Sequence, residues 1–266
     1  MSDLLLPALF TLFAWWFGTG AIIWLNRLPR STYRLTFTLA SWLAIAAFWG
    51  LAASRNVATE AGAYCAFSCA LLIWAWQEIA FLLGYVTGPR RIDLPTGSRG
   101  WQRAGFALQV VLHHELALIV LAAGVFVVTA GGSNRVGLCT FLIFWVMRQS
   151  AKLNIFLGVR NFSETFLPAH LRYLPTYFQR KPINPLFPLV VTLATAAAMG
   201  GWEFAWTHRG AGFLPVSASL ASMLLSLAVL EHWFMVLPIP FERLWQWGMG
   251  TRAEPSAPAR LSVEAT

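Results

Sequence analysis

Seven apolar stretches, each about as long as a bilayer-crossing helix, dominate this sequence. They lie at about 4–25, 35–53, 62–86, 106–130, 137–157, 186–206 and 215–237. A helix of about 20 apolar residues crosses a hydrocarbon layer of about 30 Å. Hydrophobic residues make up 58% of the 266 residues and charged residues only 11%, too few charges for a soluble domain. The chain is therefore predicted to be all-α, a polytopic transmembrane bundle of about seven spans.

Basic residues are concentrated in every second loop, and this asymmetry predicts the orientation. One set of loops carries Arg55, Arg135 and Arg209. The other set carries Arg27, Arg30, Arg34, Arg90, Arg91, Arg99, Arg103, Arg160, Arg172, Arg180, Lys181, Arg243, Arg252 and Arg260. Positively charged loops stay in the cytoplasm. The N-terminus is therefore predicted to lie outside and the C-terminus inside.

The chain is predicted to form a single membrane domain over residues 1–250, followed by a disordered cytoplasmic tail at 251–266, which is rich in Pro, Ser and Ala. The longest cytoplasmic loop, at about 158–185, mixes aromatic and basic residues and is interrupted by prolines. Such a segment is expected to lie in the interface plane as a folded platform. The net charge of +8 sits in short loops, so membrane lipids are the expected counter-charge and no nucleic-acid partner is expected.

Ionisable residues inside the spans are the unusual feature of the sequence. They are Glu78, His113, His114, Glu115, Arg148, Lys152, Glu231 and His232. Such residues cost a few kcal/mol each in the bilayer and are retained facing the protein interior, usually paired. Counting back from the cytoplasmic end of each span places them all at a depth of roughly 7 to 14 Å. They are predicted to form one intramembrane polar layer.

The simplest interpretation of this layer is an ion-pair network that fixes helix register. Arg148 and Lys152 are spaced i, i+4 and share a helix face. That face presents two cations to the acids on the other helices.

Three functional interpretations stay open beside it. Bundle helices can hold metal ions with Glu and His, although the adjacent pairs 114–115 and 231–232 point about 100° apart, so no metal is assigned. Histidine can also ligate haem or chlorophyll, or the layer can relay protons. A retinal pigment is disfavoured because the last span has no lysine for a Schiff base. Candidate pigment or metal ligands are His114, Glu115, His232 and Glu78.

Polar residues in the cytoplasmic loops are candidates for contact with the interface or with a partner. These are Arg90, Arg91, Asn161, His170 and Arg172. Anchoring on headgroups is sufficient to explain the two arginines of the Thr-Gly-Pro-Arg-Arg loop.

Several motifs resemble those of the photosynthetic complex assembly proteins of purple bacteria, the PuhE type. They lie at 74–78 (WAWQE), 87–91 (TGPRR), 114–117 (HELA), 147–161 (MRQSAKLNIFLGVRN), 167–171 (LPAHL) and 184–188 (NPLFP). The resemblance spans about residues 15 to 245, and the run at 147–161 is its most specific part.

The resemblance implies a multi-pass protein of the bacterial inner membrane, and the loop charges then place the N-terminus in the periplasm. It also implies a role in assembly of the reaction centre and core light-harvesting complex, through bacteriochlorophyll or pigment-binding subunits. No catalytic residue or fixed cofactor follows from it, although bacteriochlorophyll or another tetrapyrrole fits the setting. The alternative is a membrane enzyme or transporter of tetrapyrrole metabolism that uses the Glu/His layer. Expected partners are membrane lipids and reaction-centre, light-harvesting or other assembly proteins.

Overall fold

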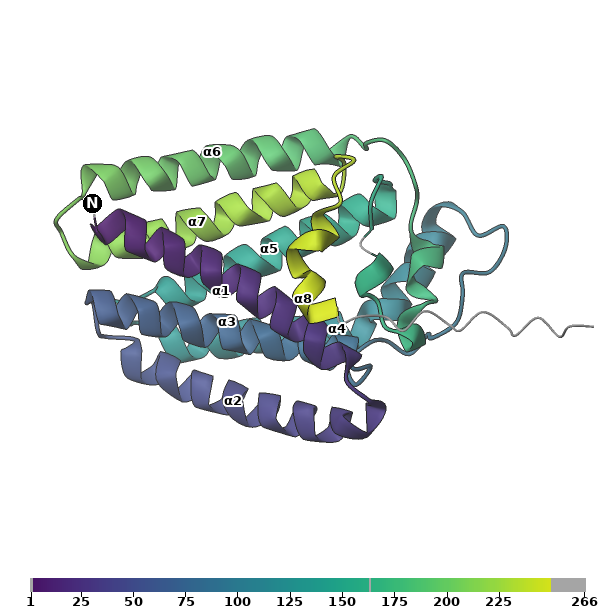
Figure 1. Ribbon diagram of the computed structural model, residues 1–266, viewed down its shortest axis with the longest axis horizontal. Coiled ribbons are helices and arrows are strands. Elements are labelled where there is room, and N and C mark those ends of the chain that lie inside the picture. The colour runs from purple at the N-terminus through teal and green to yellow at the C-terminus, as the bar shows by residue number, and fades with distance from the viewer. Residues whose placement is uncertain (1, 163, 250–266) are drawn as a thin grey trace, which may run out of the picture.

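The computed structural model describes residues 2–162 and 164–249 (Figure 1). The long helices there are α1 (Ser2–Arg27), α2 (Tyr33–Ser54), α3 (Glu60–Leu82), α4 (Gly100–Thr129), α5 (Val136–Leu157), α6 (Leu186–Thr207) and α7 (Phe213–Phe234). Short helices are η1 (Arg30–Thr32), η2 (Glu164–Phe166), η3 (Ala169–Leu171), η4 (Leu174–Tyr177), η5 (Phe241–Trp245) and α8 (Gln246–Met249). No strand occurs in these ranges, apart from an isolated bridge between Val159 and Arg180. The predicted all-α class is confirmed.

Among the described helices, six are long and apolar enough to cross a membrane, and α5 is the exception. α5 has 22 residues but carries Arg148, Gln149, Lys152 and Asn154. It still runs the length of the bundle, in contact with α3, α4 and α7. Six of the seven long helices are therefore candidate spans, and α5 runs beside them with a partly exposed face.

α3 lies at the centre of the bundle and packs against α1, α2, α4, α5 and α7 (Figure 1). Its buried residues Phe67 and Ile73 join Phe141, Leu118 and Leu220 from three other helices in the main apolar core. α2 and α6 form the two edges of the bundle, because α2 packs mainly on α3 and α6 mainly on α7. Because neighbours surround α3, it has the largest fraction of buried residues among the six apolar helices.

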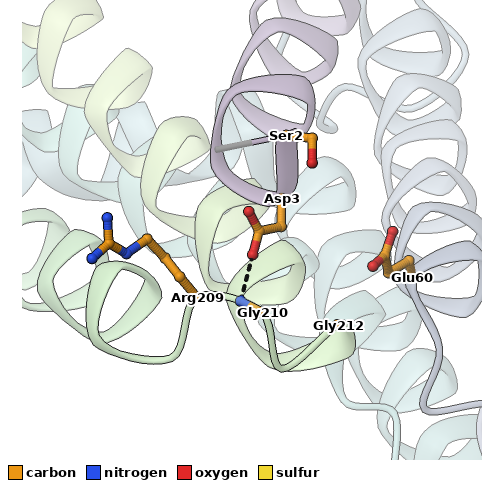
Figure 2. A pocket seen from close by; sticks show the side chains of 6 residues that line it. All are labelled: Ser2, Asp3, Glu60, Arg209, Gly210 and Gly212. Atoms are coloured by element: carbon orange, nitrogen blue, oxygen red, sulfur yellow. Dashed lines mark hydrogen bonds between the residues drawn. The ribbon is translucent and has the colours of Figure 1, made fainter.

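The two ends of the bundle differ in how they are closed. At the end that carries the N-terminus, the Asn134 amide donates to the carbonyls of Ser54 (3.1 Å) and Gly62 (2.9 Å), joining two loops. There the Gly210 N–H donates to Asp3 at 2.8 Å, beside an open pocket of about 600 Å³ (Figure 2). We call the other end, where the segments 83–99, 158–185 and 235–249 lie, the basic end.

Two of the predicted boundaries at the basic end differ from the helix ends by four to six residues. α3 ends at Leu82 and not at 86, because Gly84 takes a φ of 85° and turns the chain out of the helix. α4 begins at Gly100 and not at 106, so its first turns extend toward the platform. The predicted tail, 251–266, lies outside the described residues.

The segment after α7, residues 235–249, folds back along the C-terminal half of α1, which is nearer the basic end. The Trp16 indole donates to the Leu244 carbonyl, and the Trp245 indole donates to the Trp16 carbonyl, both at 2.9 Å. Gly20 gives this segment room, because a Cβ there would lie 2.1 Å from the ring of Trp247. These contacts hold the segment against the C-terminal half of α1.

Candidate functional site

Two ion pairs join α5 to its neighbours inside the bundle. Arg148 Nη2 lies 2.9 Å from Glu78 Oε2 on α3. Lys152 Nζ lies 2.6 Å from Glu115 Oε1 on α4. Gln149 lies between the two cations in the sequence, and its amide donates to Glu115 Oε2 at 2.5 Å. The shared face of α5 therefore binds one acid on each side.

A third acid, Glu231 on α7, has a different surrounding. Its Oε1 accepts a hydrogen bond of 2.7 Å from the Trp15 indole on α1. Glu231 also interacts electrostatically with Arg148 and Glu78. The side chain is exposed, whereas that of Glu78 is only 12% accessible. Glu231 is thus the acid of this group that lies at the bundle surface.

His114 is enclosed between α3 and α4. The Gln77 amide nitrogen lies 2.9 Å from His114 Nδ1 and 3.1 Å from its carbonyl oxygen. Because an amide NH₂ only donates, Nδ1 accepts and the proton of the neutral ring is on Nε2. Phe81 covers the ring, with centroids 4.7 Å apart. Helix packing around His114 thus leaves 1% of the residue exposed.

His232 belongs to a buried chain of polar groups between α7, α5 and the start of α6. Its Nδ1 donates to the Ala228 carbonyl at 2.8 Å, so its Nε2 accepts from Ser150 at 2.9 Å. The chain continues through Asn154, whose amide donates to the Ser150 carbonyl at 3.0 Å. Asn184 in turn donates to Asn154 Oδ1 at 3.0 Å and to the Gly158 carbonyl at 2.9 Å. These contacts fix where α5 ends and α6 begins.

His113 does not join the other seven residues, because it lies on the exposed face of α4. His114 stands 14 residues, about 21 Å, from the start of α4, because this helix begins earlier than expected. Its depth in the membrane stays a prediction. The contacts with Gln77 and Lys152 nevertheless hold α3, α4 and α5 at a common level.

The loop residues proposed for partner contact fall into two groups. Arg90 and Asn161 are used inside the protein, since Arg90 Nε donates to the Tyr177 hydroxyl at 2.8 Å and Asn161 donates to the Leu237 carbonyl at 2.6 Å. Arg91 and Arg172 are exposed, and His170 is half-buried. The second group therefore remains accessible at the basic end.

Two platform residues have shifted pKa values. Burial lowers the pKa of His170 below its ordinary value, and the positive charges of Arg30 and Arg91 lower it further. Burial raises the pKa of Tyr173. Both residues are therefore neutral near pH 7.

Arg103 was not singled out in the sequence, where it looks like one more cytoplasmic charge. In the structure it is 9% exposed, and its guanidinium donates to the carbonyls of Phe156 (2.7 Å) and Tyr177 (2.5 Å). It also stacks over the Phe156 ring at 3.9 Å. Arg103 thus joins α4, the end of α5 and the platform.

Metal binding by the candidate ligands finds little support in this geometry. Within the described ranges, His, Cys, Asp and Glu side chains nowhere gather in a group of three or more that could hold a metal ion. Glu78 and Glu115 each bind a cation of α5 instead.

Comparison with known proteins gives this bundle a family. A family model described as "Protein of unknown function (DUF3623)" matches residues 1–256. The chain belongs to the DUF3623 family. It is 36% identical over 273 residues to a Rhodobacter capsulatus protein described as "Uncharacterized 30.4 kDa protein in puhA 5'region", with 99% of each chain covered. No solved structure matches this DUF3623 protein.

Proposed function

We propose that this DUF3623 protein is an assembly factor of the bacterial inner membrane. In this proposal it holds pigment or pigment-binding subunits while the reaction centre and core light-harvesting complex form. Two observations give the setting: the resemblance to photosynthetic complex assembly proteins, and a full-length relative whose description places it in the puhA 5′ region of a Rhodobacter.

The observation that carries the proposal is the exposure of charged groups among membrane-spanning helices. The Arg148 side chain is 41% accessible and Glu231 is exposed, on neighbouring helices. An ionised side chain that faces hydrocarbon costs about 2.5–3.5 kcal/mol on insertion scales. A partner that brings polar groups to this face removes that cost, which provides a driving force for docking.

The charge count of the site favours a partner with a hydrogen-bond donor or a cation. Three acids (Glu78, Glu115, Glu231) stand against two cations (Arg148, Lys152). Each cation binds one acid, so Glu231 is left with only the Trp15 indole as a direct hydrogen-bond partner within the described part of the chain. A basic or amide side chain on a helix of the partner subunit would give the Glu231 carboxylate a second hydrogen-bond donor.

A tetrapyrrole fits some of the candidate ligands and not others. His114 and His232 have ring nitrogens bound to Gln77 and Ser150, and both residues are at most 2% exposed. A macrocycle cannot reach either ring without opening the bundle. His113, exposed on α4, is accessible from the lipid and is the histidine that suits a magnesium tetrapyrrole. Bound pigment would supply the chromophore, and His113 would supply an imidazole ligand to its magnesium.

Replacing single charges in a purple bacterium tests the assembly role. We expect Glu231→Gln and Arg148→Gln to lower the membrane absorbance of assembled reaction centre and core antenna per amount of protein on immunoblots. The level itself should be unchanged in Glu231→Gln and lower in Arg148→Gln, because Glu78 loses its cation. Glu203→Gln, which removes an exposed acid from α6, is the matched control and should leave assembly intact. Normal assembly in both site variants would contradict the proposal.

Photocross-linking identifies the partner. A benzoylphenylalanine at Leu230, which is 41% exposed and adjacent to Glu231, should capture a reaction-centre or antenna subunit. The same group at Val127, 68% exposed near the other end of α4, should not. Equal capture at both positions would show non-specific proximity.

A further inference from the structure

One side of α4 carries a regular line of exposed residues. α4 packs mainly against α2, α3 and α5, and its outer side is left uncovered by the described part of the chain. There the exposed residues recur at alternating steps of four and three: Gln109, His113, Leu116, Val120, Ala123 and Val127. We call this line the α4 seam. Steps of four and three average 3.5 residues, the repeat at which one helix packs along another.

The two polar residues of the α4 seam stand well away from the basic end of the bundle. Arg103 marks the level at which α5 ends, because its guanidinium donates to the carbonyl of Phe156 at 2.7 Å. Gln109 and His113 follow Arg103 along α4 by about 9 and 15 Å, at 1.5 Å per residue. Because α4 is a candidate span, both side chains are expected to face the hydrocarbon layer.

These two polar side chains lack partners. Both are exposed, and neither the Gln109 amide nor the His113 ring forms a hydrogen bond with a side chain or carbonyl of residues 2–162 or 164–249. The next residue, His114, shows the usual arrangement, because Gln77 binds its ring inside the bundle. Lipid tails offer no hydrogen bonds, so polar side chains in membrane helices generally face protein. A partner with polar groups at this level would therefore be favoured over lipid.

The α4 seam is complementary to itself. Copies of one chain share one orientation in a membrane, so a twofold axis along the membrane normal makes their α4 helices parallel. In a parallel pair with this spacing, Gln109 faces Gln109 and His113 faces His113 of the second copy. An amide both donates and accepts, and a neutral imidazole has one nitrogen of each kind, so each side chain can bond its own copy. Ala123, with its short side chain, lets the two helices approach closely.

We propose that the α4 seam binds the α4 seam of a second copy, in a parallel twofold dimer within the membrane. Polar residues at seam positions fix the register and the number of helices that associate, and Gln109 and His113 would do both here. A lipid tail or a wholly apolar helix would leave both side chains without hydrogen bonds. This inference does not rest on the assembly role proposed above. A magnesium tetrapyrrole on His113 would compete with the second copy, because both use the same imidazole.

Cysteine cross-linking in membranes that contain the full chain tests the proposal. In a background that lacks Cys65, Cys69 and Cys139, Val120→Cys should form a covalent dimer on oxidation, because facing seam residues come within disulfide reach. Ile119→Cys is the matched control. Ile119 is 51% exposed at the same level of α4 but points about 100° away from Val120, so it should not cross-link. Equal cross-linking at both positions would show random collision and overturn the proposal, as would the absence of a Val120→Cys dimer.

Energy transfer between fluorescently labelled copies in phosphatidylcholine liposomes, measured as lipid is added, gives the dissociation constant of the dimer. Gln109→Leu with His113→Leu should weaken the dimer about tenfold, since each hydrogen bond between membrane helices contributes roughly a factor of three. Thr192→Leu with Thr195→Leu, which removes two exposed polar side chains from α6, should leave the dissociation constant unchanged. An unchanged constant in the α4 variant, or equal weakening in the two double variants, would overturn the proposal.

Discussion

Removing Lys152 tests whether its ion pair with Glu115 stabilises the bundle. In Lys152→Met, Glu115 keeps its hydrogen bond from Gln149 but loses its cation. Breaking a buried pair from one side costs about 3–5 kcal/mol. The two side chains are 25% and 19% accessible, so we expect a loss at the low end, about 3 kcal/mol of unfolding free energy.

The double variant provides the decisive comparison. Glu115→Gln with Lys152→Met removes both charges, and the new amide at 115 can still accept from Gln149. We expect this variant to lose only about 1 kcal/mol, about 2 kcal/mol less than Lys152→Met alone. The chain has one other lysine, Lys181, at the surface, and Lys181→Met should stay within about 0.5 kcal/mol of the wild type.

The assay is unfolding of the purified protein in mixed micelles with increasing SDS, followed by tryptophan fluorescence. Lys152→Met should shift the midpoint clearly, and the double variant should recover most of the shift. Equal loss in the single and double variants would refute the reasoning, because Glu115 would then not be a buried carboxylate that needs its cation.

Further predictions concern the basic end. Asn184→Ala should cost about 2–3 kcal/mol in the same assay, because it unties the end of α5 from the start of α6. Gly88→Ala should prevent accumulation of folded protein on immunoblots, since its Cβ would lie 2.1 Å from a backbone carbonyl of α4, whereas Gly105→Ala, with open space around it, should not. Stability should fall as pH drops below 6.5, where the unfolded state binds the proton that folded His170 excludes, and His170→Gln should flatten that slope in thermal unfolding at pH 5 to 8. A cysteine at exposed Arg172, in a background without the native cysteines, should react with an impermeant maleimide from the cytoplasmic side only.

Apolar length predicted the long helices, but at the basic end it missed where α3 ends and where α4 begins. Hydropathy marks the thickness of the hydrocarbon layer, and a helix need not stop there. Leu83 and Val86 are apolar yet lie outside α3, because Gly84 turns the chain. The first turns of α4 are polar yet helical, because they pack against the platform through Arg103.

Charge was a useful guide to pairing, and uncharged polar residues gave no comparable signal. The i, i+4 spacing of Arg148 and Lys152 indicated cations that need acids, and the structure places Glu78 and Glu115 beside them. Ser150, Asn154 and Asn184 belong to residue types that occur in any polar loop or helix end. Their partners come from segments tens of residues away, so only the fold shows that they form one buried chain.

α5 shows how the least apolar of the long helices is accommodated against α3, α4 and α7. Its polar residues leave it below the apolarity that a crossing helix needs alone. Four of those residues have a partner on another helix: Arg148 binds Glu78 on α3, Lys152 and Gln149 bind Glu115 on α4, and Ser150 binds His232 on α7. The acids that α5 requires would be equally costly in lipid without its cations. The charges on α3, α4 and α5 therefore depend on each other for burial, and Glu231, the acid outside this balance, is the one that remains at the surface.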